Sequence, residues 1–553
     1  MILTPQQREA TNKNGSCLVV ACPGSGKTRT IVAKLLRSID EVRDTSRRVA
    51  CITYTNVAVE EVESRLAVYG QHDDADYCTI STIHAFCLQE ILSRFHWKLP
   101  RYGDGFAVAP PDSEEFLELA EQAAARFGTA LTFKMREGLE QLSREVDGTP
   151  IIPAGSDLTD EMVADFLTRL GERRLVTFTD IVYLSLRLLQ AHPSLARALA
   201  CRFAWMLIDE FQDTNVLQVE LLRTIAAHQR TKFFLVGDPH QSIYRFAGAR
   251  PDLMPEFARD VGAEEVPLTG NFRSSSLIVR DAQLVLPREP EMIAVGNNRD
   301  FPVAPEHHHV DHPFTALTDF FLPALTEHSI PFGNAAILAP WWTTLIPLGR
   351  QLREYQVPVL GPGARPYKRR HLLGGIAEQV CAGLDVGGLS RLPQIERELF
   401  RLLAEVFGKP NFAVFSYQGR RTASRLLHMG AELREQYLGA VEWLHAAAEA
   451  FGQVLEEDGF GTPTLTAALE QSAQDIEEEM RARGHVDADN MLVEDIGLLG
   501  NRQGSLRLMT VHASKGQEFD AVALVDLHEG KYHTGQQGRR RILRRAKGYY
   551  MLG

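Results

Sequence analysis

The chain has 553 residues, of which 44% are hydrophobic and 24% charged, and its formal net charge is −12 at pH 7. This length allows several domains, and the composition is ordinary for a globular protein. The sequence contains no run of ~20 apolar residues for a membrane helix, no secretory signal pattern and no Cys-x-x-Cys pair, which predicts a cytoplasmic protein without a zinc site, iron–sulfur cluster or disulfide framework.

The first predicted elements are a strand, a glycine-rich turn and a helix. The strand covers residues 17–20, a helical pattern covers residues 31–36, and the turn between them is Ala21-Cys22-Pro23-Gly24-Ser25-Gly26-Lys27-Thr28. This order is the context of a phosphate-binding loop. Gly24 and Gly26 allow backbone N–H groups to point at phosphate oxygens, and the helix start adds partial positive charge. Ala21 stands where the common pattern has glycine, so a chance loop is the alternative.

Two side chains at the end of this loop carry the chemistry. Lys27 is predicted to reach the β- and γ-phosphates of a nucleotide, and the Thr28 hydroxyl is predicted to ligate Mg²⁺. A second apolar strand at residues 203–208 ends in Asp209 and Glu210. Asp209 is predicted to hold Mg²⁺ through water, and Glu210 to orient or deprotonate the attacking water. The alternative is a solvated strand end.

The remaining elements indicate an α/β protein with helical insertions. A strand at residues 232–236 is followed by Gln241, which is placed to sense a γ-phosphate. Further strands are expected at residues 49–53, 335–339 and 520–525, and alternating strands and helices imply parallel sheets. Ligands bind outside the carboxyl ends of such strands. Two stretches, residues 92–175 and 385–495, are expected to be mainly helical.

Several charged runs have less specific interpretations. The acidic run from Asp475 to Glu479 is most simply a solvated helix face. The run Glu306-His307-His308-His309 resembles a metal-binding tract, but a loop is the favoured interpretation. Basic clusters at residues 365–370 and 539–547 are either solvated faces or contacts to nucleic acid. The acidic overall balance counts against a nucleic-acid binder, although a binding groove needs only local basic and aromatic residues.

In this order and at these separations, the segments together resemble the motifs of superfamily 1 helicases of the UvrD/PcrA/Rep type. The motif segments in chain order are Leu3-Thr4-Pro5-Gln6-Gln7-Arg8, the phosphate loop with Arg29, Ile52-Thr53-Tyr54-Thr55-Asn56, Thr79-Ile80-Ser81-Thr82-Ile83-His84-Ala85-Phe86, Ile208-Asp209-Glu210-Phe211-Gln212-Asp213-Thr214-Asn215, Val236-Gly237-Asp238-Pro239-His240-Gln241-Ser242-Ile243-Tyr244, Leu268-Thr269-Gly270-Asn271-Phe272-Arg273-Ser274 and Leu508-Met509-Thr510-Val511-His512-Ala513-Ser514-Lys515-Gly516-Gln517-Glu518-Phe519.

The resemblance implies two RecA-like domains with ATP and Mg²⁺ held between them. The first would comprise residues 1–91 and 176–270 with a helical insertion at 92–175, and the second residues 271–384 and 496–553 with a reduced insertion at 385–495. The nucleotide would contact Gln7, Pro23, Gly24, Ser25, Gly26, Lys27, Thr28, Arg29, Phe272 and Glu518. Among these, Gln7 would read the adenine, Arg29 and Phe272 would sandwich it, and Glu518 would lie near the ribose. Arg273 would contact the γ-phosphate and make hydrolysis depend on domain closure.

The resemblance also implies a path for single-stranded DNA. The residues expected along it are Tyr54, Thr55, Asn56, His84, Tyr244, Phe246 and His512. Aromatic side chains stack on any base and so support movement that is independent of sequence. For Tyr54 and Phe246 the alternative is core packing.

The chain departs from the family pattern in three places. Phe246 replaces the usual Trp, and Ala247 replaces the Arg that often follows it. The chain is short for the family, so the insertions are reduced. In the last motif the spacer is shortened, because Arg540-Arg541-Ile542-Leu543 runs almost directly into Arg544-Arg545-Ala546-Lys547. Arg545 matches a second arginine finger by local sequence, and we expect it to be out of register.

Two functions from different classes follow. The first is a motor that uses ATP to move 3′ to 5′ along single-stranded DNA and to unwind duplexes. The second is a subunit that senses DNA and nucleotide in a Gabija-type anti-phage complex and regulates a partner nuclease. A transporter ATPase would explain neither the Phe-Gln-Asp-Thr after Glu210 nor the segment from His512 to Phe519. No membrane partner is expected.

Overall fold

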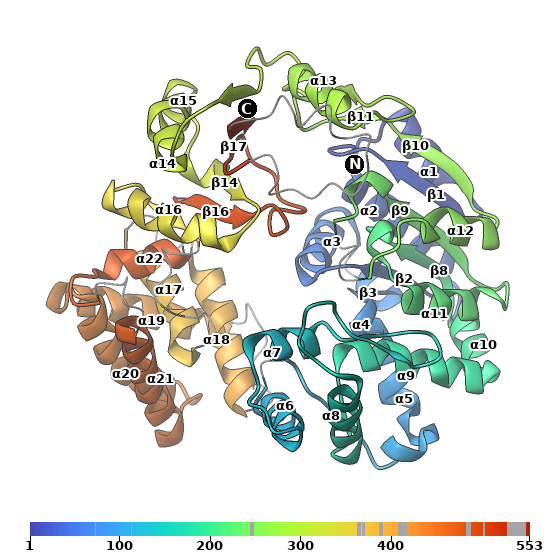
Figure 1. Cartoon of the computed structure of the whole chain (residues 1–553), viewed down its shortest axis with the longest axis horizontal. Helices are drawn as coiled ribbons and strands as arrows, with labels where there is room; N and C mark the ends of the chain where they lie inside the picture. Colours follow the sequence, from blue (N-terminus) through green and yellow to red (C-terminus); the bar gives the residue numbers. More distant parts are fainter. Residues whose placement is uncertain are drawn as a thin grey trace. The chain divides into compact units, whose positions relative to one another are not determined.

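The computed structural model describes residues 1–71, 73–111, 113–243, 248–361, 367, 371–385, 391–407, 417–482, 488–500, 504–527 and 549–552. The chain divides into two compact units, Met1–Phe301 and Pro302–Gly553 (Figure 1). Among the described helices, none combines the length and the hydrophobicity that crossing a lipid bilayer requires.

Unit 1 is built on a six-stranded sheet in the order β10-β1-β9-β8-β2-β3. All of its neighbouring strands pair in parallel. The strands are β1 (Cys17–Ala21), β2 (Arg48–Thr53), β3 (Cys78–Thr82), β8 (Phe203–Ile208), β9 (Lys232–Gly237) and β10 (Glu264–Leu268). Every residue of β8 is buried, as expected where helices cover both faces of a parallel sheet. The predicted parallel α/β fold is confirmed.

Helices cover the two faces of this sheet, as the ribbon in Figure 1 shows. Alternate residues of β8 divide between the faces: Trp205 and Leu207 pack on one side, Met206 and Ile208 on the other. The first face is covered by α1 (Pro5–Asn12), α2 (Lys27–Val42) and α3 (Asn56–Tyr69), and the second by α4 (Ile83–Phe86), α9 (Phe178–Ala191), α10 (Pro193–Arg202), α11 (Val216–Ala226) and α12 (Leu253–Asp260).

The segment between α4 and α9 contains a small core of its own. Its helices and strands are α5 (Ser93–Phe95), β4 (Ala107–Val108), α6 (Glu114–Arg126), α7 (Phe133–Glu140), β5 (Ser143–Arg144), β6 (Pro150–Ile151), α8 (Asp160–Glu172) and β7 (Leu175–Val176). The rings of Phe116 and Phe166 pack edge to face in its centre, with centroids 5.1 Å apart. Unit 1 ends with β11 (Gly270–Asn271), α13 (Ser276–Val285) and β12 (Ile293–Ala294).

Unit 2 contains a second six-stranded sheet, in the order β13-β18-β17-β14-β16-β15. Strands β15, β16, β14 and β17 pair in parallel, whereas β18 is antiparallel to β13 and β17. The elements are β13 (Glu306–His308), α14 (Pro313–Ala316), α15 (Leu322–Glu327), β14 (Ala335–Ala339), α16 (Trp342–Glu354), β15 (Val359–Leu360), β16 (Leu506–Thr510), β17 (Ala521–Leu524) and β18 (Tyr549–Leu552).

The prediction of a loop for the histidine run is wrong at Glu306–His308, which forms strand β13. Its backbone pairs with β18, a strand more than two hundred residues away in the sequence, so local sequence could not reveal the partner. His308 Nε2 lies 2.9 Å from Glu306 Oε2. Within the described ranges no group of three or more His, Cys, Asp or Glu is arranged to hold a metal ion.

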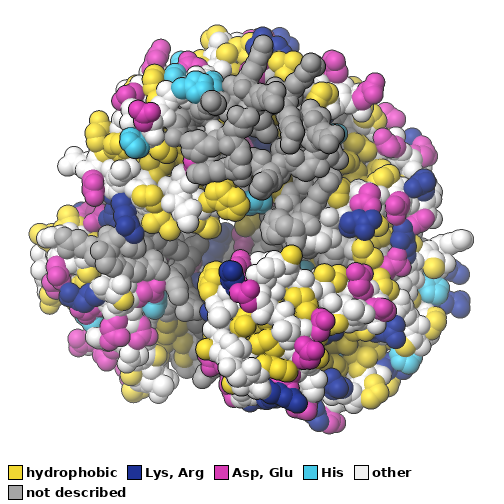
Figure 2. All heavy atoms as spheres, viewed as in Figure 1, with side chains coloured by type: hydrophobic (Ala, Val, Ile, Leu, Met, Phe, Trp, Pro, Cys, Tyr) yellow, Lys and Arg dark blue, Asp and Glu magenta, His cyan; other side chains and the backbone are white. Residues whose placement is uncertain are grey.

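The second part of unit 2 is a bundle of helices between β15 and β16. Its helices are α17 (Leu372–Asp385), α18 (Leu392–Phe407), α19 (Tyr417–Gln436), α20 (Ala440–Glu457), α21 (Pro463–Ala482) and α22 (Val493–Gly500). They enclose a core that includes the fully buried Trp443. The predicted solvated acidic face is confirmed at Asp475 and Glu478 of α21, which are exposed. Glu477 and Glu479 are partly buried instead, and they pair with His445 at 2.8 Å and with His371 at 2.6 Å. Figure 2 shows acidic side chains gathered around α20 and α21 at the lower left.

Candidate active site

The glycine-rich loop between β1 and α2 adopts a backbone that only glycine accepts easily. Gly24 and Gly26 have φ angles of +65° and +78°, in the left-handed region. A Cβ atom on Gly24 would lie 2.9 Å from Arg273 Cβ and from Asn271 Oδ1. A Cβ atom on Gly26 would lie 2.8 Å from Gln7 Nε2. Both glycines are therefore required by conformation and by space.

The loop has the polar groups that a polyphosphate needs. The hydroxyl of Ser25 is buried and has no hydrogen-bond partner among the described residues. The first N–H groups of a helix have no acceptor within the helix, so the start of α2 presents donors and partial positive charge beside the loop. These features fit the phosphate groups of a nucleotide.

Gln7 holds this loop from α1. Its Nε2 donates to the carbonyl oxygen of Ser25 at 2.9 Å, and its Oε1 accepts from the backbone N of Thr4 at 3.0 Å. The side chain is 1% exposed. In this structure, then, Gln7 supports the phosphate loop and the helix start. Its expected role in reading adenine stays a prediction.

Three of the predicted catalytic side chains meet at the carboxyl end of the sheet. Lys27 Nζ, in the first turn of α2, donates to Glu210 Oε2 at 3.2 Å and to Gln241 Oε1 at 3.0 Å. Glu210 is the second residue after β8 and has a left-handed φ of 49°, while Gln241 ends the 3₁₀ turn η6 (Pro239–Gln241) after β9. Their meeting follows from the topology, because β1, β9 and β8 are neighbours in the sheet.

The carboxylate that precedes Glu210 in the sequence, that of Asp209, is buried. Asp209 is 7% exposed, and its Oδ1 accepts from the backbone N of Glu210 at 2.9 Å. Burial raises the pKa of Asp209, and the negative charge of Glu210 raises it further, while the charge of Lys27 acts in the opposite direction. Two crowded carboxylates are the setting in which a bound cation reverses the local electrostatics.

Mg²⁺ fits this donor set. The ion takes one or two protein carboxylates together with substrate phosphate oxygens and water, so it needs no dedicated protein cage. Asp209 would hold it from the end of β8, and the hydroxyl of Thr28 would hold it from the first turn of α2.

Arg273 is placed beside the phosphate loop by a buried asparagine. Asn271 is 2% exposed, and its Oδ1 accepts from the backbone N of Arg273 at 2.9 Å and of Ser274 at 2.8 Å. The backbone N of Phe272 donates to the carbonyl oxygen of Gly24 at 2.8 Å. Arg273 itself is exposed, and its segment belongs to unit 1 together with the loop.

Sequence reasoning missed the anchoring roles of Asn271 and Gln6. Gln6 donates from Nε2 to Thr269 Oγ1 at 3.1 Å and accepts at Oε1 from the backbone N of Thr269 at 3.1 Å, which ties α1 to the segment before β11. An asparagine whose side chain accepts from the backbone N two residues later is a known turn signal. In contrast, nothing in the local sequence indicates that Gln6 binds Thr269. Arg29, which was predicted to stack on the adenine together with Phe272, is exposed on α2.

Four of the predicted DNA-contacting residues follow the ends of β2 and β3. Tyr54 is half-buried, Thr55 caps α3 by accepting from the backbone N of Ala58 at 3.2 Å, and Asn56 is exposed. His84 lies edge to face with Phe178 at 6.1 Å, and burial lowers the pKa of its imidazole. Since β8, β2 and β3 are consecutive in a parallel sheet, these residues share its carboxyl edge with Glu210.

The remaining predicted residues lie elsewhere. Tyr244, Phe246 and Arg545 are outside the described residues. His512 and Glu518 belong to unit 2, where both are exposed in the segment after β16.

Comparison with known proteins agrees with the motif series. Residues 3–262 match the family described as UvrD/REP helicase N-terminal domain. The ATP-dependent DNA helicase Rep of Escherichia coli K12 is 29% identical over 300 residues, which cover 53% of this chain and 44% of that protein. The ATP-dependent DNA helicase UvrD1 of Mycobacterium leprae is 31% identical over 312 residues, which cover 52% of this chain and 39% of that protein.

A longer alignment joins the chain to the ATP-dependent DNA helicase PcrA of Leuconostoc citreum, at 24% identity over 599 residues, with 95% of this chain and 76% of that protein covered. In contrast, the matches to Rep and UvrD1 span less than half the length of those relatives. The matched family segment contains the phosphate loop, both carboxylates and Gln241. The segment of residues 3–262 therefore matches the UvrD/REP helicase N-terminal domain family, and the chain is similar to DNA helicases named Rep, UvrD1 and PcrA.

Proposed function

We propose that this chain hydrolyses ATP with Mg²⁺ and uses the energy to move 3′ to 5′ along single-stranded DNA or to unwind a duplex. The observation that supports it most strongly is the placement of Lys27 Nζ between Glu210 and Gln241, beside a loop shaped for phosphate. The similar proteins Rep of Escherichia coli and PcrA of Leuconostoc citreum bear the name ATP-dependent DNA helicase, which agrees with this chemistry.

The chain's own groups would divide the work of hydrolysis. Mg²⁺, when bound, would neutralise charge on the β- and γ-phosphates. The Lys27 ammonium would turn from Glu210 towards the phosphate oxygens. Glu210, relieved of that partner, would orient the attacking water and accept its proton. Gln241 would contact the γ-phosphate through its amide, and Arg273 would stabilise the charge that develops during transfer.

The DNA path is proposed for the same edge of the sheet in unit 1. Tyr54 and His84 offer ring faces for stacking, and Thr55 and Asn56 offer polar groups for the backbone of the strand. A shared edge would allow nucleotide state to influence DNA contacts through the ends of β8, β2 and β3.

We assign the domains as the motif series predicts. The first RecA-like domain comprises residues 1–91 with 176–270, and the second comprises residues 271–384 with 496–553. The helical insertions are residues 92–175 and 385–495.

A second function, sensing of DNA and nucleotide beside a partner nuclease, stays an alternative. It predicts that the purified chain binds ATP and DNA but hydrolyses ATP slowly without that partner. The motor predicts rapid hydrolysis by the chain alone, stimulated by single-stranded DNA. ATP turnover by the isolated protein therefore separates the two.

The test of the proposed chemistry is Glu210→Gln. The amide keeps the shape of the side chain and loses the base, so we expect ATP binding within a few-fold of wild type and turnover lower by about 10²- to 10⁴-fold. The matched control is Glu220→Gln, which changes another partly exposed glutamate of unit 1 that pairs with Arg223. Loss of nucleotide binding in Glu210→Gln, or equal turnover in both variants, would contradict the assigned role.

A further inference from the structure

A buried glutamine connects Glu210 to the end of the neighbouring strand. Gln212 lies in the 3₁₀ turn η5 (Phe211–Asp213) and has no exposed surface. Its Nε2 donates to Glu210 Oε2 at 2.5 Å, and its Oε1 accepts from the backbone N of Asp238 at 2.9 Å. Because both ends of the amide are engaged, Gln212 fixes the direction of the Glu210 carboxylate relative to β9.

The space for this amide exists because the last residue of β9 is glycine. A Cβ atom on Gly237 would lie 2.6 Å from Gln212 Oε1 and 2.8 Å from Met254 Sδ. The side chain of Gln212 is thus packed between the ends of β8 and β9 and cannot turn without displacing its neighbours. Its orientation is set by packing as well as by hydrogen bonds.

Asp238 carries the same connection to Gln241. Its carboxylate is fully buried, and Oδ1 accepts from the backbone N of His240 at 3.0 Å and from Arg288 at 2.9 Å. The backbone N of Gln241 donates to the carbonyl oxygen of Asp238 at 2.9 Å. Arg288, from the segment between α13 and β12, is largely buried itself and supplies the positive charge that a buried carboxylate requires.

Together these contacts form a closed set around the proposed reaction centre. Lys27 joins the side chains of Glu210 and Gln241 on the phosphate side, and Gln212 with Asp238 joins the side chain of Glu210 to the backbone N of Gln241 on the interior side. On the basis of the proposed ATP hydrolysis, we propose that Gln212 is a positioning residue, anchored through Asp238 by Arg288, which holds Glu210 and Gln241 in the mutual arrangement that hydrolysis needs.

A purely structural role for Gln212 makes a different prediction from a positioning role. Gln212→Leu keeps the side-chain bulk and removes both hydrogen bonds. If Gln212 positions Glu210, kcat for ATP should fall by roughly 10- to 100-fold, while KM changes by less than about 3-fold. A structural role predicts a lower melting temperature and kcat close to that of wild type. The matched control is Gln218→Leu, because Gln218 is also buried but caps α11 through Asn215.

The decisive measurement is a double-mutant cycle between Gln212→Leu and Glu210→Gln. If Gln212 acts through the Glu210 carboxylate, Gln212→Leu should cause no further loss of kcat in the Glu210→Gln background. Additive losses in the cycle, or a Gln212→Leu enzyme with wild-type kcat, would overturn the positioning role while leaving the proposed ATPase intact. Absence of ATP hydrolysis by the wild-type chain would overturn both.

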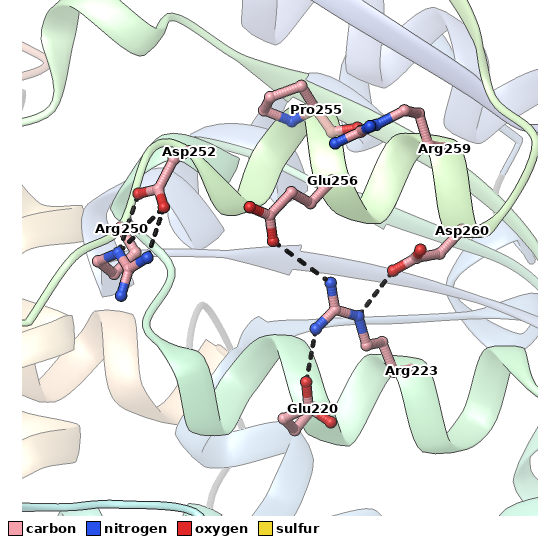
Figure 3. Close-up of polar contacts among 8 residues, drawn as sticks. All are labelled: Glu220, Arg223, Arg250, Asp252, Pro255, Glu256, Arg259 and Asp260. Atoms are coloured by element: carbon pink, nitrogen blue, oxygen red, sulfur yellow. Dashed lines mark hydrogen bonds and ion pairs between the residues drawn. The ribbon is translucent and has the colours of Figure 1, made fainter.

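The anchoring by Arg288 has its own test. Lysine can replace the single donor that Arg288 offers to Asp238, so Arg288→Lys should retain more kcat than Arg288→Met, with ATP binding alike in both. Arg223→Met is the control, because Arg223 pairs with Glu220 at 2.6 Å, Asp260 at 2.7 Å and Glu256 at 3.7 Å, all on α11 and α12 (Figure 3). Equal kcat for Arg288→Lys and Arg288→Met, or a loss as large in Arg223→Met, would overturn this anchoring role.

Discussion

The side chain of Lys34 offers a quantitative test of how the phosphate-loop helix is attached to α1. It is fully buried, and its Nζ donates to the carbonyl oxygens of Lys13 at 2.7 Å and Thr11 at 3.4 Å, at the C-terminal end of α1. The same ammonium lies 3.7 Å from the ring centroid of Trp205. Burial lowers the pKa of Lys34 from 10.5 to about 8. Burial in the folded chain thus disfavours the charged form of Lys34, although the two carbonyl oxygens and the Trp205 ring would interact favourably with that charge.

The sign of the resulting pH dependence follows from proton linkage. Between pH 8 and pH 10.5 the unfolded chain holds a proton on Lys34 that the folded chain has released, so the free energy of unfolding rises with pH in this window. With these two pKa values the gain between pH 7 and pH 9.5 is about 2 kcal/mol. Lys34→Met keeps the apolar stem and removes the titrating group, so this gain should be absent.

Urea unfolding of wild type and Lys34→Met at pH 7 and pH 9.5, followed by circular dichroism, measures this effect. The difference between the proteins should be about 2 kcal/mol larger at pH 9.5, and other titrating groups cancel in the comparison. The two units can unfold in separate steps, so hydrogen exchange of peptides from α1 and α2 identifies the transition of unit 1. An equal difference at both pH values would refute the argument that burial sets this pKa.

Three further predictions concern the proposed nucleotide and DNA sites. Gly24→Ala should weaken binding of a fluorescent ATP analogue at least 10-fold, because its Cβ atom would meet two side chains at 2.9 Å, whereas Gly15→Ala has open space and should bind normally. Tyr54→Ala should weaken binding of an oligothymidine by about 1–3 kcal/mol without lowering the melting temperature, and the reverse outcome would indicate core packing. Arg273→Ala should lower turnover on the order of 10³-fold, whereas Arg545→Ala should be nearly silent. A comparable loss in Arg545→Ala, with no gain from a longer spacer before it, would show that the finger is in register.

The sequence predicted the main strands and the glycine-rich loop because both depend on local patterns. The strand expected at residues 203–208 is β8, Phe203–Ile208, and the strand expected at 335–339 is β14, Ala335–Ala339. Continuous apolar runs are sufficient for strands covered on both faces. The glycine-rich loop was recognisable because its backbone demands specific residues at fixed spacing. Strand β13 was missed because its hydrogen bonds come from β18, far along the chain.

The interior support of the proposed site could not be predicted in the same way. The contact between Gln212 and Asp238 depends on the register of β8 against β9, in which Ile208 pairs with Leu235. The amide of Gln212 bridges the ends of β8 and β9 only because the fold places these ends side by side, so neither segment alone indicates the contact. Arg288 is fifty residues from Asp238 in the sequence, and no local pattern around either residue indicates the pair. Hydrogen bonds that cross between elements are a property of the fold.

ATP hydrolysis by the purified chain, with and without single-stranded DNA, tests the central claim most directly. We predict that oligothymidine stimulates turnover by wild type, and that Lys27→Ala abolishes turnover while the protein stays folded, because the charge-assisted contact to the phosphates is lost. Oligothymidine binding should weaken with salt in both proteins. Turnover by Lys27→Ala within a few-fold of wild type, or no response to DNA in wild type, would contradict the account.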